Sequence, residues 1–365
     1  MAKNRIFYQS QAVYAGKAAP LGVYSEETGV SSKPNNLQRI QNINYSFDVT
    51  RTDVNQFGQL ANIDRVILES PTVSLDFSYY VANFQNENRL GFTINAHGGG
   101  SATNSAISGM LNRQTDERNY YIRVVKEGAD AVGFATGPTN NDTVGIGNGF
   151  LASYTSEASV GDFPTASVTV EGLNIQFAKG TTGFLPKVDP TAGQAETVLQ
   201  YSLSNTTADA GSKNYSVVRP GDITLSTLVN GALGANVTDA KIQSYNISFD
   251  LAREPLNRLG TKFAFAREIT FPVTVSLSVD ALVGELDDGN LATILNTDAT
   301  LGDIVIHLKS GSADNIAYVL KGAKLDGHSY SNSIGDNKTV TMNFSTQIGS
   351  AEQQGVGLFM SGHHS

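Results

Sequence analysis

Residues 40–75 read IQNINYSFDVTRTDVNQFGQLANIDRVILESPTVSL, and residues 242–277 read IQSYNISFDLAREPLNRLGTKFAFAREITFPVTVSL. The two stretches align without a gap at a constant offset of 202 residues (242 minus 40), and fifteen of the thirty-six aligned positions are identical. Self-similarity at a fixed spacing indicates a repeated structural unit, and it has to be considered before any shorter motif. We therefore expect two copies of one domain in tandem.

Weaker similarity extends the two copies on their C-terminal sides. LNRQTDERNYYIRVVKEGAD from Leu111 aligns with LNTDATLGDIVIHLKSGSAD from Leu295, and FLASYTSEASVG from Phe150 resembles VTMNFSTQIGSA from Val340. The length of 365 residues agrees with two domains, because a single core stops growing at roughly 250 to 300 residues. The predicted ranges are a first domain over 1–183, a linker or insertion rich in Pro, Gly, Thr and Ser over 184–214, and a second domain over 215–365.

The period of the apolar residues predicts strands in both copies. IQNINYSFDV and IQSYNISFDL alternate apolar and polar residues, as do the later stretches SPTVSLDFSYYV and FPVTVSLSVDALV. Short helices are expected over 104–112 and 287–296, where apolar residues recur at helical spacing. The fold class is therefore mainly β, with two tandem antiparallel sandwich or barrel domains that each carry one or two short α-helices. Phe47 and its equivalent Phe249 are the predicted core anchors.

Composition and charge exclude several classes of function. The chain has no cysteine, so disulfides, thiol nucleophiles and thiolate metal sites are excluded. A formal net charge of −9 opposes tight binding to nucleic acid phosphates, although an acidic surface can also serve solubility alone. No stretch approaches the ~20 apolar residues of a bilayer span, and no signal peptide pattern is found, so we expect no membrane insertion.

The motifs that could carry catalysis or bind a cofactor do not have the context they need. His97-Gly98-Gly99-Gly100 matches an oxyanion-hole sequence, but the G-x-S-x-G nucleophile elbow that goes with it is missing. The histidines have no metal-binding i, i+4 spacing, and the acidic or amide-rich turns GELDDGN and NNDTVGIGNG lack the calcium-loop ligand pattern. We therefore predict no catalytic, cofactor-binding or metal-binding residue and no enzymatic activity.

Charged residues and glycines that recur in both copies have two interpretations. They could form the same subunit contact in each copy, or they could clamp the turn within each domain, as residues that the fold requires; we favour the clamp. The glycines are expected to supply a positive backbone torsion in that turn. The residues concerned are Asp48 with Asp250, Arg51 with Arg253, Arg65 with Arg267, and Gly58 with Gly260.

The repeated strand and charged turn, the segment ASVGDFPTASVTVEGLNIQF and the N-terminal extension rich in Tyr, Gln and Ala resemble the tail tube proteins of tailed bacteriophages, in the subclass with a duplicated tube domain. A duplicated unit suits a symmetric ring, because a two-copy chain closes the ring with half as many subunits. The resemblance implies homotrimers that form pseudo-hexameric rings. These rings would stack into a tube through which the phage genome passes during ejection without specific binding.

The resemblance also implies the partners and the location of the protein. The partners would be further copies of the chain, other tail proteins and the passing DNA, and the protein would be assembled in the host cytoplasm and located in the virion. Residues 1–36 would be an N-terminal arm that reaches an adjacent ring. Two alternatives remain at this point: another virion component, such as a baseplate or neck ring or a capsid decoration protein, and a tandem carbohydrate-binding module.

Overall fold

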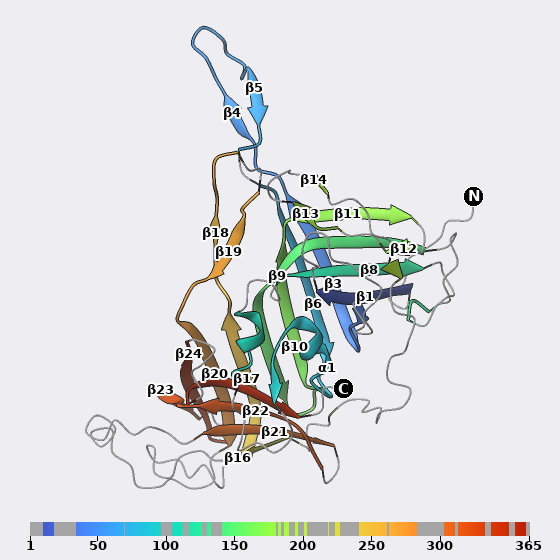
Figure 1. Ribbon diagram of the computed structural model, residues 1–365. Helices are drawn as coiled ribbons and strands as arrows, with labels where there is room; N and C mark the ends of the chain where they lie inside the picture. Colours follow the sequence, from blue (N-terminus) through green and yellow to red (C-terminus); the bar gives the residue numbers. More distant parts are fainter. Residues whose placement is uncertain are drawn as a thin grey trace.

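β-Strands form nearly all of the regular structure in the computed structural model, and α1 (Gln85–Leu90) is the one α-helix among the described residues (Figure 1). None of the described helices is long and apolar enough to cross a membrane. The residues that the structure describes are 10–17, 34–68, 70–95, 104–111, 117–125, 130–132, 141–179, 182–183, 186–189, 194–195, 201–202, 218, 223–226, 241–260, 263–282, 303–310, 313–332, 337–349 and 355–362.

One long antiparallel sheet runs through both halves of the chain, as its pairings show. Its first four strands come from the first half and its last four from the second. In spatial order they are β3 (Ile40–Asp48), β6 (Thr72–Tyr80), β10 (Thr165–Gly172), the C-terminal part of β9 (Asn141–Ser159), β17 (Lys241–Asp250), β20 (Val273–Leu282), β24 (Thr339–Ile348) and β23 (Lys324–Ser331).

Two further sheets run crosswise to the long sheet (Figure 1). The first cross sheet contains β2 (Asn35–Asn36), β1 (Gln11–Lys17), β8 (Arg118–Val125), the N-terminal part of β9 and β11 (Asn174–Lys179). The second contains β16 (Ile223–Ser226), β21 (Ile304–Ser310), β22 (Ala313–Lys321), β25 (Gly357–Gly362) and β7 (Ile94–Asn95). Apolar side chains of all three sheets form one hydrophobic core that spans both halves.

The first two strands of each half pair in the same register. In β3 and β6, Ile40 lies opposite Tyr79 and Phe47 opposite Val73, with an irregularity after Ile40. In β17 and β20, Ile242 lies opposite Ala281 and Phe249 opposite Val275, with an irregularity after Ile242. Each residue of the first pair of strands thus differs from its counterpart in the second pair by 202, the offset of the sequence alignment.

The next two strands of each half correspond at a different offset. Thr165 of β10 lies opposite Glu157 of β9, and Thr339 of β24 lies opposite Ser331 of β23, which makes the offset 174 for both strands (339 minus 165 and 331 minus 157). Each pair has one bulge, and the extra residues, Ala152 and Asp326, also differ by 174. The two halves therefore share their strand order, registers and bulges across the long sheet.

This register corrects one of the sequence alignments. Phe150 lies opposite Glu171, as Lys324 lies opposite Ser345, so Phe150 corresponds to Lys324 and not to Val340. The alignment from Leu111 fits the structure better, because Ile122 and Ile306 occupy corresponding places beside Val144 and Tyr318. Apolar alternation recurs every two residues, so a short strand matches an unrelated strand at several shifts.

The predicted N-terminal arm is wrong for residues 11–17. They form β1, which pairs with β8 along its whole length, and the side chains of Val13 and Tyr14 are fully buried. Because β1 contributes to the core, deletion of residues 1–36 would expose apolar surface. The predicted linker 184–214 is described only in part; there Val188 is buried, and its N–H donates a hydrogen bond to Oδ1 of Asn148 in β9. The domain boundaries themselves stay a prediction.

The predicted helices and core anchors have mixed outcomes. Of the predicted helix over 104–112, the described residues 104–111 contain a 3-10 turn (Ser108–Met110) and no α-helix. Residues 287–296 lie outside the described residues, and α1 was not predicted. Phe249 is buried, with 3% of its surface exposed, whereas Phe47 is 57% exposed, so the prediction of Phe47 as a core anchor is wrong. Phe249 packs against Phe92 and Tyr154 of the first half, while Phe47 lies on β3 at the end of the sheet.

Truncation of the two phenylalanines should therefore have unequal effects on the monomeric chain. Phe249→Ala should lower the free energy of unfolding by about 3 to 5 kcal/mol, because it leaves a cavity between two aromatic rings. Phe47→Ala should change it by less than ~1 kcal/mol, because the side chain is already largely in water. Urea unfolding followed by circular dichroism measures the free energy of unfolding of both variants. Equal decreases would show that β3 is covered in the monomer.

Candidate assembly interface

The two halves of the chain meet where β9 pairs with β17. The pairing runs from Ser159 opposite Ser244 to Ser153 opposite Asp250, and we call it the internal junction. On its core face, the ring of Tyr154 stacks on Phe249 with centroids 5.6 Å apart. On its other face, Nδ2 of Asn246 donates a hydrogen bond of 3.2 Å to Oε2 of Glu157. The halves are thus joined by backbone pairing, aromatic packing and polar contacts.

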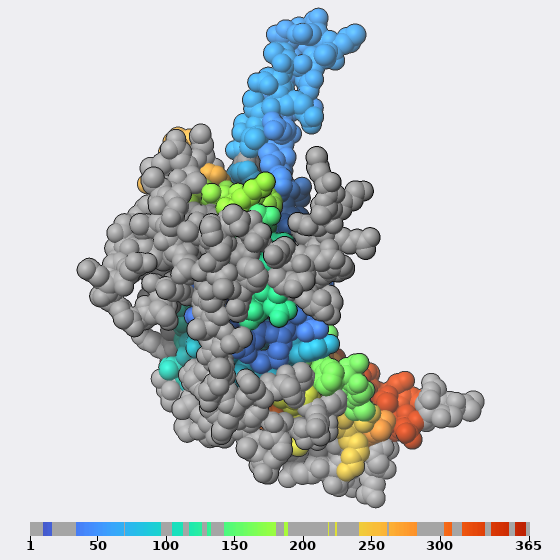
Figure 2. Space-filling view, turned by 90° about the vertical axis from the view of Figure 1, so that its right-hand side faces the viewer, coloured from blue at the N-terminus to red at the C-terminus, as the bar shows by residue number. Residues whose placement is uncertain are grey.

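Two hairpins extend from the ends of the long-sheet strands (Figure 1). The first, β4 (Thr52–Val54) with β5 (Asp64–Val66), projects well beyond the body of the molecule (Figures 1 and 2). The second is β18 (Arg253–Leu256) with β19 (Ala266–Ile269). Gly58 and Gly260 have φ of 85° and 89°, so the predicted positive torsion is present at both. Phe57 and Leu60 near the tip of the first hairpin are fully exposed.

The repeated arginines make different contacts in the two halves. Nε of Arg65 lies 2.6 Å from Oδ1 of Asp53 across its own hairpin, which is the predicted turn clamp, although the acid is not Asp48. In contrast, Nη1 of Arg267 lies 3.3 Å from Oε2 of Glu171, in the other half of the chain. The Arg267 side chain is 9% exposed; burial lowers its pKa, and the Glu171 carboxylate opposes that effect.

Arg253 extends the contact between the second hairpin and the first half. Its guanidinium lies 4.8 Å from the centre of the Phe150 ring, and that of Arg267 lies 5.9 Å from the same ring. A guanidinium over an aromatic face is favourable, and more so when water is excluded. The base of the second hairpin thus contacts Phe150 and Glu171 beside the internal junction, although the Glu171 side chain stays 58% exposed. Sequence analysis missed both residues. The sequence held a signal for this contact. Pro255 occupies the position that corresponds to Asp53, so the second hairpin lacks the acid that pairs with the arginine in the first hairpin.

Both ends of the long sheet are open among the described residues. β3 has β6 as its only strand neighbour there, and β23 has β24. Tyr45 and Phe47 of β3 are 42% and 57% exposed, and Tyr330 of β23 is 38% exposed. Open edges with apolar side chains invite pairing with another chain unless they are covered.

A buried polar cluster of one glutamate and three tyrosines lies inside the core. The hydroxyls of Tyr79 and Tyr154 donate hydrogen bonds of 2.9 and 3.2 Å to Oε1 of Glu87 in α1, and the Tyr154 hydroxyl lies 2.8 Å from that of Tyr318. Burial raises the pKa of Glu87 to about 7 and that of each tyrosine well above its usual value.

This Glu87 cluster joins the halves from within and is sealed from solvent, since all four side chains are fully buried. A substrate has no access to them, so we interpret the cluster as structural. Among the residues described, no three His, Cys, Asp or Glu side chains are placed to hold a metal ion. His97, His363, His364 and the GELDDGN turn lie outside these residues, and NNDTVGIGNG contributes most of its length to β9.

The Glu87 cluster predicts a specific pH dependence of stability. The pKa of Glu87 is higher in the folded chain, about 7, than the ordinary value of 4.5. The contribution of Glu87 to the free energy of unfolding is therefore complete below pH 4.5. It is lost, by about 3 kcal/mol, as the pH rises through 7. Glu87→Gln should remove this part of the pH dependence of the monomer, measured by urea unfolding from pH 4.5 to 8. A wild-type minus variant difference that does not change with pH would contradict the assignment.

Comparison with known proteins gives no assignment: no protein-family model matches the chain, and no curated protein matches it significantly.

Proposed function

We propose that the chain is a non-enzymatic structural subunit that assembles head to tail, through the ends of its long sheet, into the rings of a phage tail tube. One observation carries the proposal: the two open strands correspond to the two strands that pair at the internal junction. β3 corresponds to β17 at an offset of 202, and β23 corresponds to the C-terminal part of β9 at an offset of 174. A second copy of the chain can therefore present β23 to β3 as β9 is presented to β17.

The exposure of corresponding residues supports this contact. Phe47 is 57% exposed where Phe249 is 3% exposed, because the first half of the chain covers Phe249. Phe177 of β11 is 62% exposed, whereas its counterpart Met360 of β25 is fully buried and pairs with Ile94 of the first half. At both places the second half is covered by the first half. Among the described residues the first half has no such cover, and the second half of another copy would supply it.

Repetition of one head-to-tail contact leads either to a closed ring or to an open helix, depending on the rotation at each step. Three two-unit chains would give a pseudo-hexameric ring, which is the assembly implied by the resemblance to duplicated tail tube proteins. Closure would also leave no long-sheet edge exposed. Stacked rings would enclose a channel, and an acidic protein with a formal charge of −9 suits the passage of DNA without tight binding. The chain would then be located in the virion, and its partners would include other tail proteins.

Mass photometry and negative-stain electron microscopy of the purified chain test this function. We expect trimer masses, or rings and tubes built from them. A monomer at all concentrations would contradict the proposal, and a monomer that also binds glycans would favour a carbohydrate-binding module.

A point variant separates assembly from folding. Phe47→Asp places a charge on the open face of β3 and should abolish ring formation, while the monomer keeps its circular dichroism spectrum and unfolding midpoint because the side chain is exposed. Val160→Asp is the matched control, since Val160 is 65% exposed in the turn between β9 and β10, away from both open strands. Rings that persist in Phe47→Asp would show that β3 is not the contact.

A further inference from the structure

Three polar side chains meet where β9 passes from the first cross sheet into the long sheet. Asn148 of β9 is 3% exposed, and its Nδ2 donates a hydrogen bond to Oε1 of Glu117, the residue directly before β8. Nζ of Lys187 lies 3.4 Å from Oε2 of the same carboxylate. The side chains of Lys187 and Glu117 are 11% and 19% exposed. One carboxylate thus binds an amino group and a carboxamide at the same time, largely shielded from solvent.

The backbone around Lys187 is held directly against β9. The N–H of Val188 donates a hydrogen bond of 2.8 Å to Oδ1 of Asn148, so the residue after Lys187 contacts the carboxamide itself. On the other side, a Cβ on Gly147 would collide with the carbonyl group of Pro186, and only glycine lets the two backbones approach so closely. Lys187 is therefore positioned beside Asn148 by the backbone on both sides of it.

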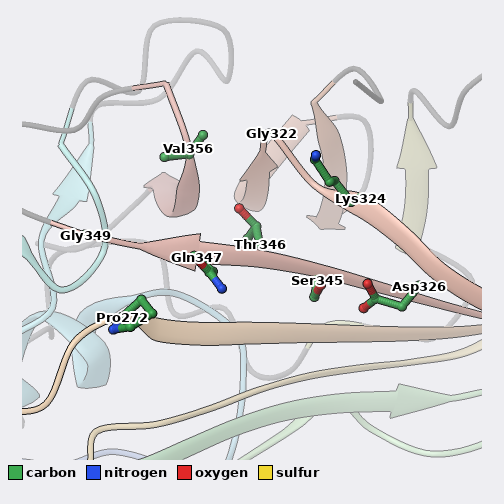
Figure 3. Close-up of a pocket in the computed structure, with 9 residues that line it drawn as sticks. All are labelled: Pro272, Gly322, Lys324, Asp326, Ser345, Thr346, Gln347, Gly349 and Val356. Carbon is green, nitrogen blue, oxygen red and sulfur yellow. The ribbon is translucent and has the colours of Figure 1, made fainter. Parts of the chain in front are cut away.

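The second half makes the same backbone bend with a glycine. The offset of 174 (322 minus 148) places Gly322 at the position of Asn148, and the two residues have φ of 60° and 53°. Both values lie in the left-handed region, which glycine adopts most readily. Gly322 contributes only backbone to the hollow of about 520 Å³ that it lines (Figure 3). The bend therefore does not require an asparagine, and the contacts of the Asn148 side chain need another explanation.

We propose that Lys187 and Asn148 form an intramolecular isopeptide bond, with Glu117 as the residue that transfers the protons. Glu117 accepts a proton from the Lys187 ammonium, which is easier where water is largely excluded, because a neutral pair then costs less than two charges. Nζ of Lys187 attacks Cγ of Asn148, while the N–H of Val188 stabilises the negative charge that develops on Oδ1. Glu117 then gives the proton to the leaving nitrogen.

The reaction balances without a further reactant. The bond between Cγ and Nδ2 of Asn148 breaks, and a bond between Cγ and Nζ of Lys187 forms. Both protons that Nζ loses end on the leaving nitrogen, which departs as ammonium. A lysine ammonium has three N–H groups, so its contact with Glu117 is compatible with further contacts of Lys187 before the reaction. The bond forms within one chain and so does not depend on the proposed assembly. It closes a loop that contains β10 and β11, which restricts the unfolded chain as a disulfide does.

Mass spectrometry of the purified, denatured chain tests the bond. The parent chain should be lighter than its sequence requires by one ammonia, about 17 Da. Trypsin does not cleave after an acylated lysine, so digestion should yield a branched product in which residues 127–179 are joined to residues 180–213. A parent chain with the full mass of its sequence, cleaved by trypsin after Lys187, would overturn the proposal.

Three variants assign the roles of the residues. Glu117→Gln keeps an oxygen for the Asn148 side chain but cannot take up the proton, and Lys187→Arg keeps the positive charge without a nucleophilic amine. Both should have the full mass of their sequences and give no branched product. Lys179→Arg is the matched control, since Lys179 is exposed on β11, and it should lose ammonia as the parent does. Loss of ammonia in Lys187→Arg would place the reaction elsewhere in the chain, and a branched product in Glu117→Gln would contradict the role of Glu117.

Discussion

The antiparallel hydrogen bonding between β9 and β17 is the constraint on which the rest of the structure depends. It runs from Ser159 opposite Ser244 to Ser153 opposite Asp250, and it joins eight strands from two halves into one sheet. The packing of Tyr154 on Phe249, the ion pair of Arg267 with Glu171 and the contact of Tyr154 with Tyr318 in the Glu87 cluster accompany this connection. Each of them is a contact between the first and the second half of the chain, so the proposed assembly would repeat a contact that the chain already contains.

Among the described residues, the same arrangement leaves β3 and β23, the counterparts of β17 and β9, with one strand neighbour each at the ends of the sheet. The proposed closed ring would resolve this, because each end of the sheet would meet the other type of end and each half would have the neighbours that the internal junction already provides. The exposure of the side chains agrees with this arrangement. Phe47 and Phe177 are exposed at places where their counterparts Phe249 and Met360 are buried, so what distinguishes the halves is the neighbour and not the strand.

The sequence predicted the strands of the long sheet well and their environment less well. Alternation and the offset of 202 were enough to place β3, β6, β17 and β20, because strand pairing within a unit depends on residues inside the unit. Burial of Phe47 was predicted wrongly because the first half of the chain covers Phe249, whereas no described residue covers Phe47 in the same way. Phe150 was misaligned because a period of two residues matches at several shifts, and only the bulges at Ala152 and Asp326 define the register. Glu87 was missed because α1 spans six residues, too few for helical periodicity to be visible.

Hydrogen–deuterium exchange of the assembled protein tests the central claim most directly. It compares the backbone amides of β3 and β23 in the parent chain with those in the monomeric Phe47→Asp variant. If these strands pair between copies as β9 pairs with β17, their amides will exchange slowly only in the assembly, at rates similar to those of the internal junction, which stays protected in both forms. Equal exchange of β3 and β23 in the assembled and monomeric proteins would contradict the account.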